Sequence, residues 1–167
     1  MSSNDSTSKT LIVAFSLSIV CAIFVSAATV MLKPVQEINK SLDKKRNILA
    51  AAGMLEEGVS IEEQFAKVTT RVVDLRTGTF ADDFDVRKYD QRKAAKDPAA
   101  SEKLTAEQDL AKISRRENYA VIYLVKNDAG DIDKIILPIR GYGLWSTLHG
   151  FIALESDANT VAGLGFY

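Results

Sequence analysis

The sequence is poor in the residues that most catalytic and metal sites use. It holds one cysteine, Cys21, and one histidine, His149. A single thiol cannot close an internal disulfide, and one histidine without cysteine or histidine partners does not make a metal site. A hydrolytic triad would depend on His149, which we interpret as an ordinary strand residue. We therefore predict no catalytic residue and no metal ligand.

The sequence also lacks a large excess of positive or negative charge. The formal net charge is -1 and the isoelectric point is about 5.9, so the chain lacks the basic footprint of a nucleic-acid-binding protein. Hydrophobic residues make up 47% and charged residues 26% of the chain. These values are ordinary for a folded domain and argue against disorder.

One long uncharged run occupies the N-terminus. The segment Leu11–Leu32 contains no charged residue, and at about 1.5 Å per residue it would span roughly 33 Å as a helix, the thickness of a bilayer core. We predict a transmembrane helix at residues 11–32, after a short tail at residues 1–10. Pro34 is expected to end this helix, because proline disrupts helix interiors.

Two other interpretations compete with a membrane anchor. Val25–Ala27 resembles a signal-peptidase site, but the apolar run continues past it, which favours an uncleaved anchor. A buried globular helix would carry a polar stripe, and this run has none. The orientation stays open, because the basic residues after the span favour a cytoplasmic domain whereas long domains translocate regardless of such charges.

Helical signals continue beyond the span. Residues 33–56 are predicted to form a juxtamembrane helix or stalk that ends at Gly53. Its basic residues Lys44, Lys45 and Arg46, with Lys33, are interpreted as juxtamembrane anchors. The remainder, residues 57–167, is predicted to be a soluble domain.

The first half of this domain has mixed signals. Ser60 and Glu63 form a capping box that predicts a second helix, and residues 69–80 alternate in polarity as a strand does. Residues 85–103 carry many charges of both signs and little apolar surface, so we expect a solvated surface excursion. A third helix is expected from Thr105 to about Arg116, again behind a capping box.

The second half is predicted to be β-structure. Four runs are rich in β-branched and aromatic residues and are separated by turn sequences: 119–125, 134–139, 148–155 and 160–167. They predict an antiparallel meander with one face covered by the preceding helices, an α+β fold. The last run would leave an open sheet edge, so we expect this fold to need more sequence than the chain holds.

Four stretches make the chain resemble a known family. "YDQRKAAK", "LTAEQDLAKI", "GYGLWS" and "NTVAGLGFY" occur here in order, and with them the whole chain resembles the C subunit of the bacterial Na(+)-translocating NADH:quinone oxidoreductase. The G subunit of the Rnf electron-transport complex is a more distant relative. The resemblance covers the N-terminal two thirds of the family's length.

The resemblance implies an electron carrier within a membrane complex. The family holds FMN covalently and relays electrons between other redox centres of the complex, while electron flow from NADH to ubiquinone drives sodium export. It implies a single-pass protein of the cell inner membrane with a periplasmic domain. The expected partners are the other subunits of the complex and the lipid bilayer.

The family's flavin-attachment motif does not occur in this chain. That motif is an acidic residue followed by Ser-Gly-Ala-Thr, and the resemblance places it beyond Tyr167. Ser26–Thr29 reads "SAAT" but lies within the apolar run without an acidic residue before it, so we interpret it as part of the span.

The resemblance places one segment near the flavin: Gly141, Tyr142, Gly143, Leu144 and Trp145. Glycine permits close backbone approach, and Trp145 could pack on the flavin ring. The other interpretation is a hairpin in which Trp145 fills the core. The alternative function is a membrane-anchored binding or assembly module without redox chemistry.

Overall fold

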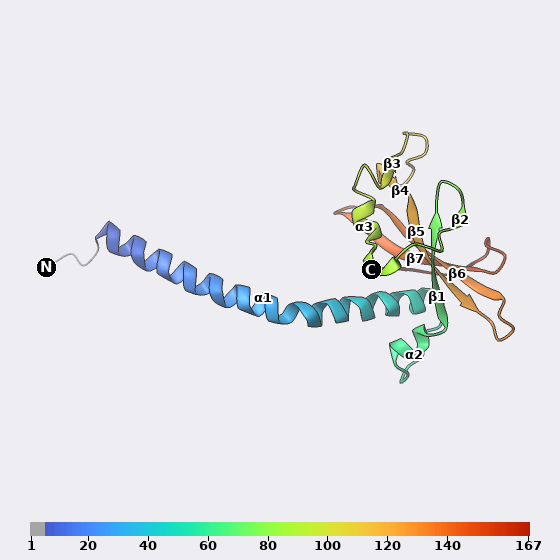
Figure 1. The fold of residues 1–167 in the computed structure, drawn as a ribbon, viewed down its shortest axis with the longest axis horizontal. Helices are drawn as coiled ribbons and strands as arrows, with labels where there is room; N and C mark the ends of the chain where they lie inside the picture. Colours follow the sequence, from blue (N-terminus) through green and yellow to red (C-terminus); the bar gives the residue numbers. More distant parts are fainter. Residues whose placement is uncertain (1–5) are drawn as a thin grey trace. The chain divides into compact units, whose positions relative to one another are not determined.

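The computed structural model describes residues 6–167, which form one long helix followed by a sheet domain (Figure 1). The helix, α1, runs Thr7–Ala51. The chain divides into two compact units, of which the first ends at Ser41 and the second runs Leu42–Tyr167. The last turns of α1 therefore belong to the same unit as the sheet.

In the first unit the apolar side chains of α1 are exposed on all sides. Leu17 is 63% exposed and Phe24 72%. Two polar side chains within the run donate back to the helix, Ser18 Oγ to the Ala14 carbonyl and Thr29 Oγ1 to the Val25 carbonyl, both at 2.8 Å. Within residues 6–167, α1 is the one helix long and apolar enough to cross a membrane.

The prediction that Pro34 ends the helix is wrong, because Pro34 lies inside α1. Its ring removes one backbone hydrogen bond, which costs roughly 3 kcal/mol. The helix continues because the next turns have helix-forming residues and its end is fixed by packing, with Ile48 and Leu49 buried. Tertiary burial outweighs the local penalty.

The end of α1 follows the sequence expectation. Gly53 adopts a φ of +67°, and the amides of Gly53 and Met54 bond the carbonyls of Ala50 and Leu49 at 3.1 and 2.9 Å. This left-handed glycine closes the helix and satisfies its last carbonyls. The predicted stop at Gly53 is confirmed.

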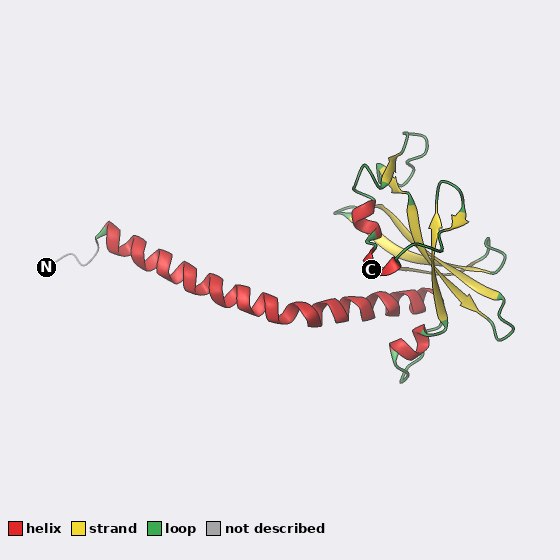
Figure 2. Ribbon diagram, viewed as in Figure 1, coloured by secondary structure: helices red, strands yellow, loops and turns green. Residues whose placement is uncertain are grey.

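The domain is built on a six-stranded sheet in the order β2-β1-β5-β6-β7-β8 (Figure 2). Every neighbouring pair is antiparallel. The strands are β1 (Val68–Asp74), β2 (Thr79–Phe80), β5 (Tyr119–Lys126), β6 (Ile132–Tyr142), β7 (Thr147–Glu155) and β8 (Val161–Phe166). The predicted meander and the α+β class are confirmed, and β1 extends the sheet beside β5.

The core lies on one face of this sheet. Val121 and Tyr123 of β5 share that face with Ile136 and Phe151, their neighbours across the ladder. The last turns of α1 pack on this face. The helix α2 (Ile61–Phe65) adds its last residue, whose ring meets that of Tyr123 edge-on at 6.1 Å. Ser60 caps α2 as predicted, with Ser60 Oγ accepting from the Glu63 amide at 3.2 Å, which is one of the two bonds of a capping box.

A glycine on β8 lets α1 approach the sheet. A Cβ at Gly163 would collide with the Ala51 carbonyl oxygen, whereas one at Gly165 would meet Ala51 Cβ at an ordinary 3.9 Å. Both glycines lie on the core face, opposite Ala153 and Phe151. Packing therefore explains the glycine at position 163 of the "AGLGFY" stretch, because only glycine leaves room for the end of α1.

The opposite face of the sheet is also apolar and is only partly covered. Leu124, Ile135 and Leu154 are paired on it across β5, β6 and β7. Towards β8 its large side chains are exposed, among them Leu148, Leu164 and Phe166. This second face resembles the buried side of a two-layer structure.

The charged stretch 85–103 is more ordered than predicted. It forms the 3-10 turn η1 (Val86–Lys88), the helix α3 (Gln91–Ala94) and the strand β3 (Ser101–Lys103), which pairs with β4 (Arg115–Glu117) in a second sheet. Ala94, Ala95 and Ser101 are buried. Asp85 and Asp90 cap η1 and α3 by accepting backbone N–H bonds. The charged side chains of this stretch are exposed, as expected for a solvated surface, and two of its acidic residues also organise the backbone.

The predicted third helix from Thr105 is wrong. Its capping contact forms, with Gln108 Oε1 accepting from the Thr105 amide at 3.2 Å, but the chain makes only turns. The Asp109 carboxylate takes the amides of Ile113 and Ser114 at 2.7 and 2.8 Å, and Ser114 has a φ of +64°. Side-chain bonding to the backbone replaces the helical bonds, as Asp favours.

Candidate functional site at the β6–β7 hairpin

The loop singled out by the sequence joins β6 to β7. Tyr142 pairs with Thr147 as the last step of the ladder, and the Gly143 amide bonds the Ser146 carbonyl at 2.9 Å. A Cβ at Gly143 would lie 2.6 Å from that carbonyl oxygen and 2.7 Å from Leu148 Cγ. Gly143 is therefore required by the tight turn of the loop itself.

The aromatic and aliphatic side chains of this loop point to solvent. Trp145 is 94% exposed, Leu144 86% and Tyr142 70%. The interpretation of Trp145 as a core residue is wrong, because a core tryptophan would be almost fully covered. An exposed indole beside an exposed leucine is unfavourable in water, which points to a ligand or partner at this position.

The loop also has backbone N–H groups that are not hydrogen-bonded within the protein. Within the part of the chain that the structure describes, the amides of Leu144 and Trp145 make no hydrogen bond. Two free N–H donors next to an exposed indole suit a flat heteroaromatic ligand with acceptor atoms on its edge, since stacking and edge bonding act together. These residues fit an isoalloxazine ring.

His149 lies on β7 directly across from Arg140 of β6. Burial is the largest cause that lowers its pKa below 6.5, followed by the positive charges of Arg92, Arg140 and Lys96, while Glu117 acts in the opposite direction. Burial and the neighbouring positive charges therefore favour the neutral imidazole. Nothing in this geometry gives it a role beyond its place in the strand.

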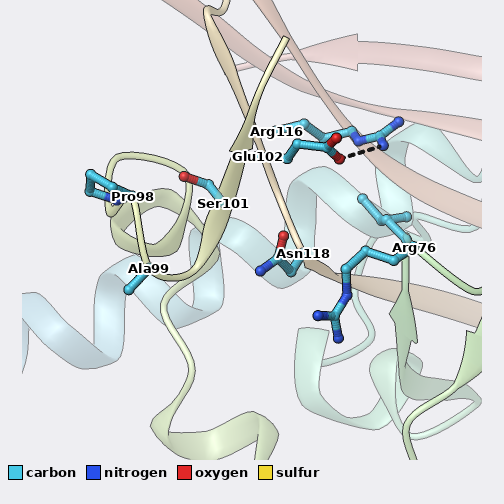
Figure 3. A pocket seen from close by; sticks show the side chains of 8 residues that line it. Arg76, Pro98, Ala99, Ser101, Glu102, Arg116 and Asn118 are labelled. Carbon is cyan, nitrogen blue, oxygen red and sulfur yellow. Dashed lines mark ion pairs between the residues drawn. The ribbon is translucent and has the colours of Figure 1, made fainter.

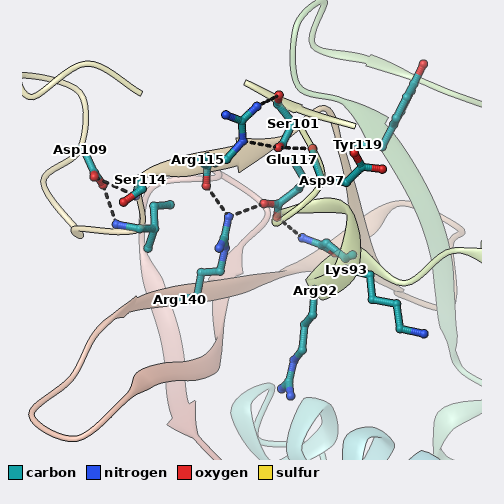
Figure 4. Close-up of polar contacts among 12 residues, drawn as sticks. Arg92, Lys93, Asp97, Ser101, Asp109, Ser114, Arg115, Glu117, Tyr119 and Arg140 are labelled. Atoms are coloured by element: carbon teal, nitrogen blue, oxygen red, sulfur yellow. Dashed lines mark hydrogen bonds and ion pairs between the residues drawn. The ribbon is translucent and has the colours of Figure 1, made fainter. Parts of the chain in front are cut away.

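The loop is supported by residues that sequence reasoning missed. Just before it, the Arg140 guanidinium donates to Glu117 Oε2 and to the Arg115 carbonyl, both at 2.7 Å (Figure 4). The Tyr142 amide bonds the Ala111 carbonyl at 2.8 Å. The sequence offered no signal for these contacts, because they join strands far apart in the chain.

A separate open pocket of about 570 Å³ lies beside the β3–β4 sheet (Figure 3). Arg116 at its wall pairs with Glu102 at 3.6 Å. Arg76 is held by Asp74, and the hydrogen bonds from Arg76 lower the pKa of Asp74 to about 2. The lining includes no residue of the Gly141–Trp145 loop. Its charges are already paired, so it is a weaker candidate than the loop.

In residues 6–167, no group of three or more His, Cys, Asp or Glu side chains is arranged to hold a metal ion. The described chain combines a long apolar N-terminal helix with an antiparallel-sheet domain, and one hairpin of the sheet carries the exposed aromatic loop.

Sequence comparison identifies the relatives of this chain. No family model matches it. The C subunit of the Na(+)-translocating NADH-quinone reductase of Pseudomonas aeruginosa is 53% identical over 171 residues, covering 100% of this chain and 65% of the relative. The corresponding protein of Vibrio vulnificus is 54% identical over 169 residues, with the same shares covered. The chain thus spans about 65% of the length of these curated relatives.

Solved structures agree with this relationship. Shewanella oneidensis NqrC matches with a TM-score of 0.68 and 35% identity, over 77% of this chain and 60% of that one. The C subunit from Parabacteroides distasonis matches with a TM-score of 0.59 over 81% of this chain and 57% of that one. At 24% identity, the second match supports the fold alone. The chain is therefore homologous, along its whole length, to the C subunits of Na(+)-translocating NADH-quinone reductases, and the resemblance seen in its sequence is confirmed.

Proposed function

We propose that this chain is part of a membrane-anchored electron-transfer subunit of a sodium-translocating NADH:quinone reductase. In this proposal α1 anchors the protein in the cell inner membrane with its domain on the periplasmic side, and the domain holds FMN. The whole-chain identity of 53% to a curated C subunit supports the assignment to the complex. The exposed loop Gly141–Trp145 is the observation that supports the flavin.

The residues of the loop would divide the work of holding the cofactor. Trp145 offers a flat apolar surface, and the free amides of Leu144 and Trp145 offer donors to the ring edge. The flavin supplies electron transfer, and its potential responds to local polarity and hydrogen bonding. Tyr142 and Leu144 would exclude water from the ring. No residue of this chain needs to move a proton for that role.

A gel experiment tests the flavin proposal. A C subunit of family length, coexpressed with a flavin transferase, should give a band with flavin fluorescence on a denaturing gel. The 167-residue chain should give a dark band, because the resemblance places the acceptor threonine beyond Tyr167. A family-length protein that carries no flavin would contradict the proposal.

The second candidate function is a binding or assembly module without redox chemistry. It is favoured by the apolar second face of the sheet, where Leu148, Leu164 and Phe166 are exposed. The flavin content of this protein in the purified complex separates the two. One flavin per copy supports the electron carrier, whereas none would leave the assembly role.

A further inference from the structure

The second half of β6 has lost one of its neighbours in the sheet. β5 and β6 pair from Lys126↔Ile132 to Tyr123↔Ile136 and then separate. Beyond Ile136, the ladder continues only with β7, as far as Tyr142↔Thr147. The strand that leads into the Gly141–Trp145 loop is therefore unsupported by the sheet along one side.

Contacts from outside the main sheet take the place of β5 on that side. Arg140 reaches across to β4, where its guanidinium bonds Glu117 Oε2 and the Arg115 carbonyl, each at 2.7 Å (Figure 4). Two residues further on, the Tyr142 amide bonds the Ala111 carbonyl at 2.8 Å. Ala111 and β4 belong to one continuous segment, so a single piece of chain supports the strand at two points.

Glu117 is the centre of this support. It is 7% exposed, and both its carboxylate oxygens are used. Oε1 accepts from Gln91 Nε2 at 2.6 Å and Oε2 accepts from Arg140. Gln91 in turn accepts from the Val121 amide of β5 at 3.0 Å. The carboxylate therefore ties α3 and β5 to the strand that carries the loop.

A buried ion pair of this kind contributes little net stability. Desolvation of two charges offsets their attraction, and well-packed apolar replacements are often as stable. Its geometry, by contrast, is strict, because every bond of the pair and its neighbours must be satisfied. The described residues leave no buried side-chain polar atom without a partner. Such a network suits a role in holding one arrangement.

We propose that Glu117 is a positioning residue, which acts through Arg140 to hold the Gly141–Trp145 loop in its ligand-binding arrangement. The identity of the ligand at this loop is taken from the proposed function, and this part of the proposal depends on it. The support itself is a property of this chain, and it can be tested without flavin. Glu117 is not expected to touch the ligand.

Hydrogen exchange in the 167-residue chain, in detergent micelles, measures the support directly. In Glu117→Gln the side chain keeps its shape but loses the charge that orients Arg140. We expect the hydrogen-bonded amides of the segment 141–146, Tyr142 above all and then Gly143, to exchange at least about tenfold faster. Amides of β1 and of β7 near Phe151 should keep their protection.

The matched control is Glu102→Gln on the neighbouring strand β3. It breaks the exposed pair of Glu102 with Arg116 and should leave exchange at 141–146 unchanged. A second readout is the fluorescence anisotropy decay of Trp145, the only tryptophan of the chain. The fast component, which reports motion of the loop, should grow in Glu117→Gln and not in the control.

Three results would overturn the proposal. The first is unchanged exchange at 141–146 in Glu117→Gln, and the second is equal loss of protection throughout the sheet, which would mean a general structural role. If Glu117→Gln does not fold by circular dichroism, Arg140→Lys takes its place, because it keeps the charge but its ammonium does not extend as far as the Arg140 Nη2 atom that makes both bonds. The third is that this milder variant leaves 141–146 unchanged. None of these results bears on flavin content, so the flavin proposal stands or fails separately.

Discussion

The two ends of helix α1 present similar apolar side chains to different surroundings. Towards the N-terminus, Leu17 and Phe24 project into open space with more than half their surface exposed. Near the C-terminal end, Leu49 is 0% exposed beneath the sheet. The first part of this helix therefore has an apolar surface that nothing in the described chain covers, as the proposed membrane anchor requires, whereas its last turns are covered by protein.

The largest expected effect is on the covered end. Leu49→Ala should lower the free energy of unfolding of the domain by about 2–5 kcal/mol, because it removes a fully buried side chain and leaves a cavity. The measurement is chemical denaturation in micelles. Leu17→Ala is the matched control in the other half, and it should leave the unfolding curve of the domain unchanged. Equal effects of the two would remove the distinction between the ends.

The next effect concerns the exposed end. Ile19→Lys should cost roughly 2.5–3.5 kcal/mol of insertion free energy, because a charge would lie at the centre of the span. Membrane fractionation and a glycosylation-site insertion assay would report it. Ala50→Lys, at an exposed position of the last turns, should not change fractionation. Unchanged fractionation together with an unchanged glycosylation pattern in Ile19→Lys would contradict the placement of Ile19 at the centre of a span.

A smaller effect should appear where the covered end meets β8. Gly163→Ala places a methyl group against the Ala51 carbonyl and should cost about 1–3 kcal/mol of domain stability by overpacking. Gly165→Ala meets only an ordinary contact and serves as the control. Thermal unfolding of both variants makes the comparison. A Gly163→Ala domain as stable as the control would mean that the helix end is not held where the structure places it.

The smallest effect is electrostatic and lies within the sheet domain. Burial and the charges of Arg92, Arg140 and Lys96 lower the pKa of His149 below 6.5, and Glu117 opposes them. Because the folded state binds this proton less readily than the unfolded state, domain stability should fall as the pH drops from about 6.5 towards the lowered value.

Proton NMR of the single imidazole can follow this titration. Arg92→Ala should raise the pKa of His149, since it removes a positive charge, while Lys103→Ala on β3 should leave it in place. A titration midpoint at or above 6.5 in the unmodified protein would contradict the expectation that burial and the nearby positive charges lower this pKa.

The sequence was most informative where the pattern is local and repeated. The uncharged run, the Gly53 stop, the Ser60 cap and the four β-rich runs each depend on neighbours a few residues apart, and the structure has all of them. The β1–β5 pairing was not predictable, because it joins residues about fifty positions apart and no single tight turn connects the two strands.

The two incorrect predictions of helix ends share one cause. Pro34 was expected to end a helix, and Thr105 was expected to begin one, because both expectations weighed only local propensity. In α1, burial of Ile48 and Leu49 overrides the proline. After Thr105, the Asp109 carboxylate captures the backbone amides that a helix would have used. In both places contacts beyond the nearest turn decided the outcome.

For the candidate site, the sequence indicated the loop and the structure indicated what supports it. "GYGLWS" shows two glycines and an indole between strands, which is enough to suggest a ligand-binding turn. Whether Trp145 pointed inward or outward could not be read from it, since both arrangements use the same residues. The exposure of Trp145, and the support of the loop through Arg140 and Glu117, depend on the tertiary structure, in which the β5–β6 pairing ends at Ile136.

By itself, the sequence determined that this protein has a lipid-compatible N-terminal helix and a β-rich domain, because hydrophobic periodicity and turn chemistry act over short distances. Only the tertiary structure decided where α1 becomes buried in the domain, why β8 carries glycine at 163, and which buried carboxylate holds the loop. Those features arise from close packing and from hydrogen bonds between distant segments, and such contacts exist only once the chain has folded.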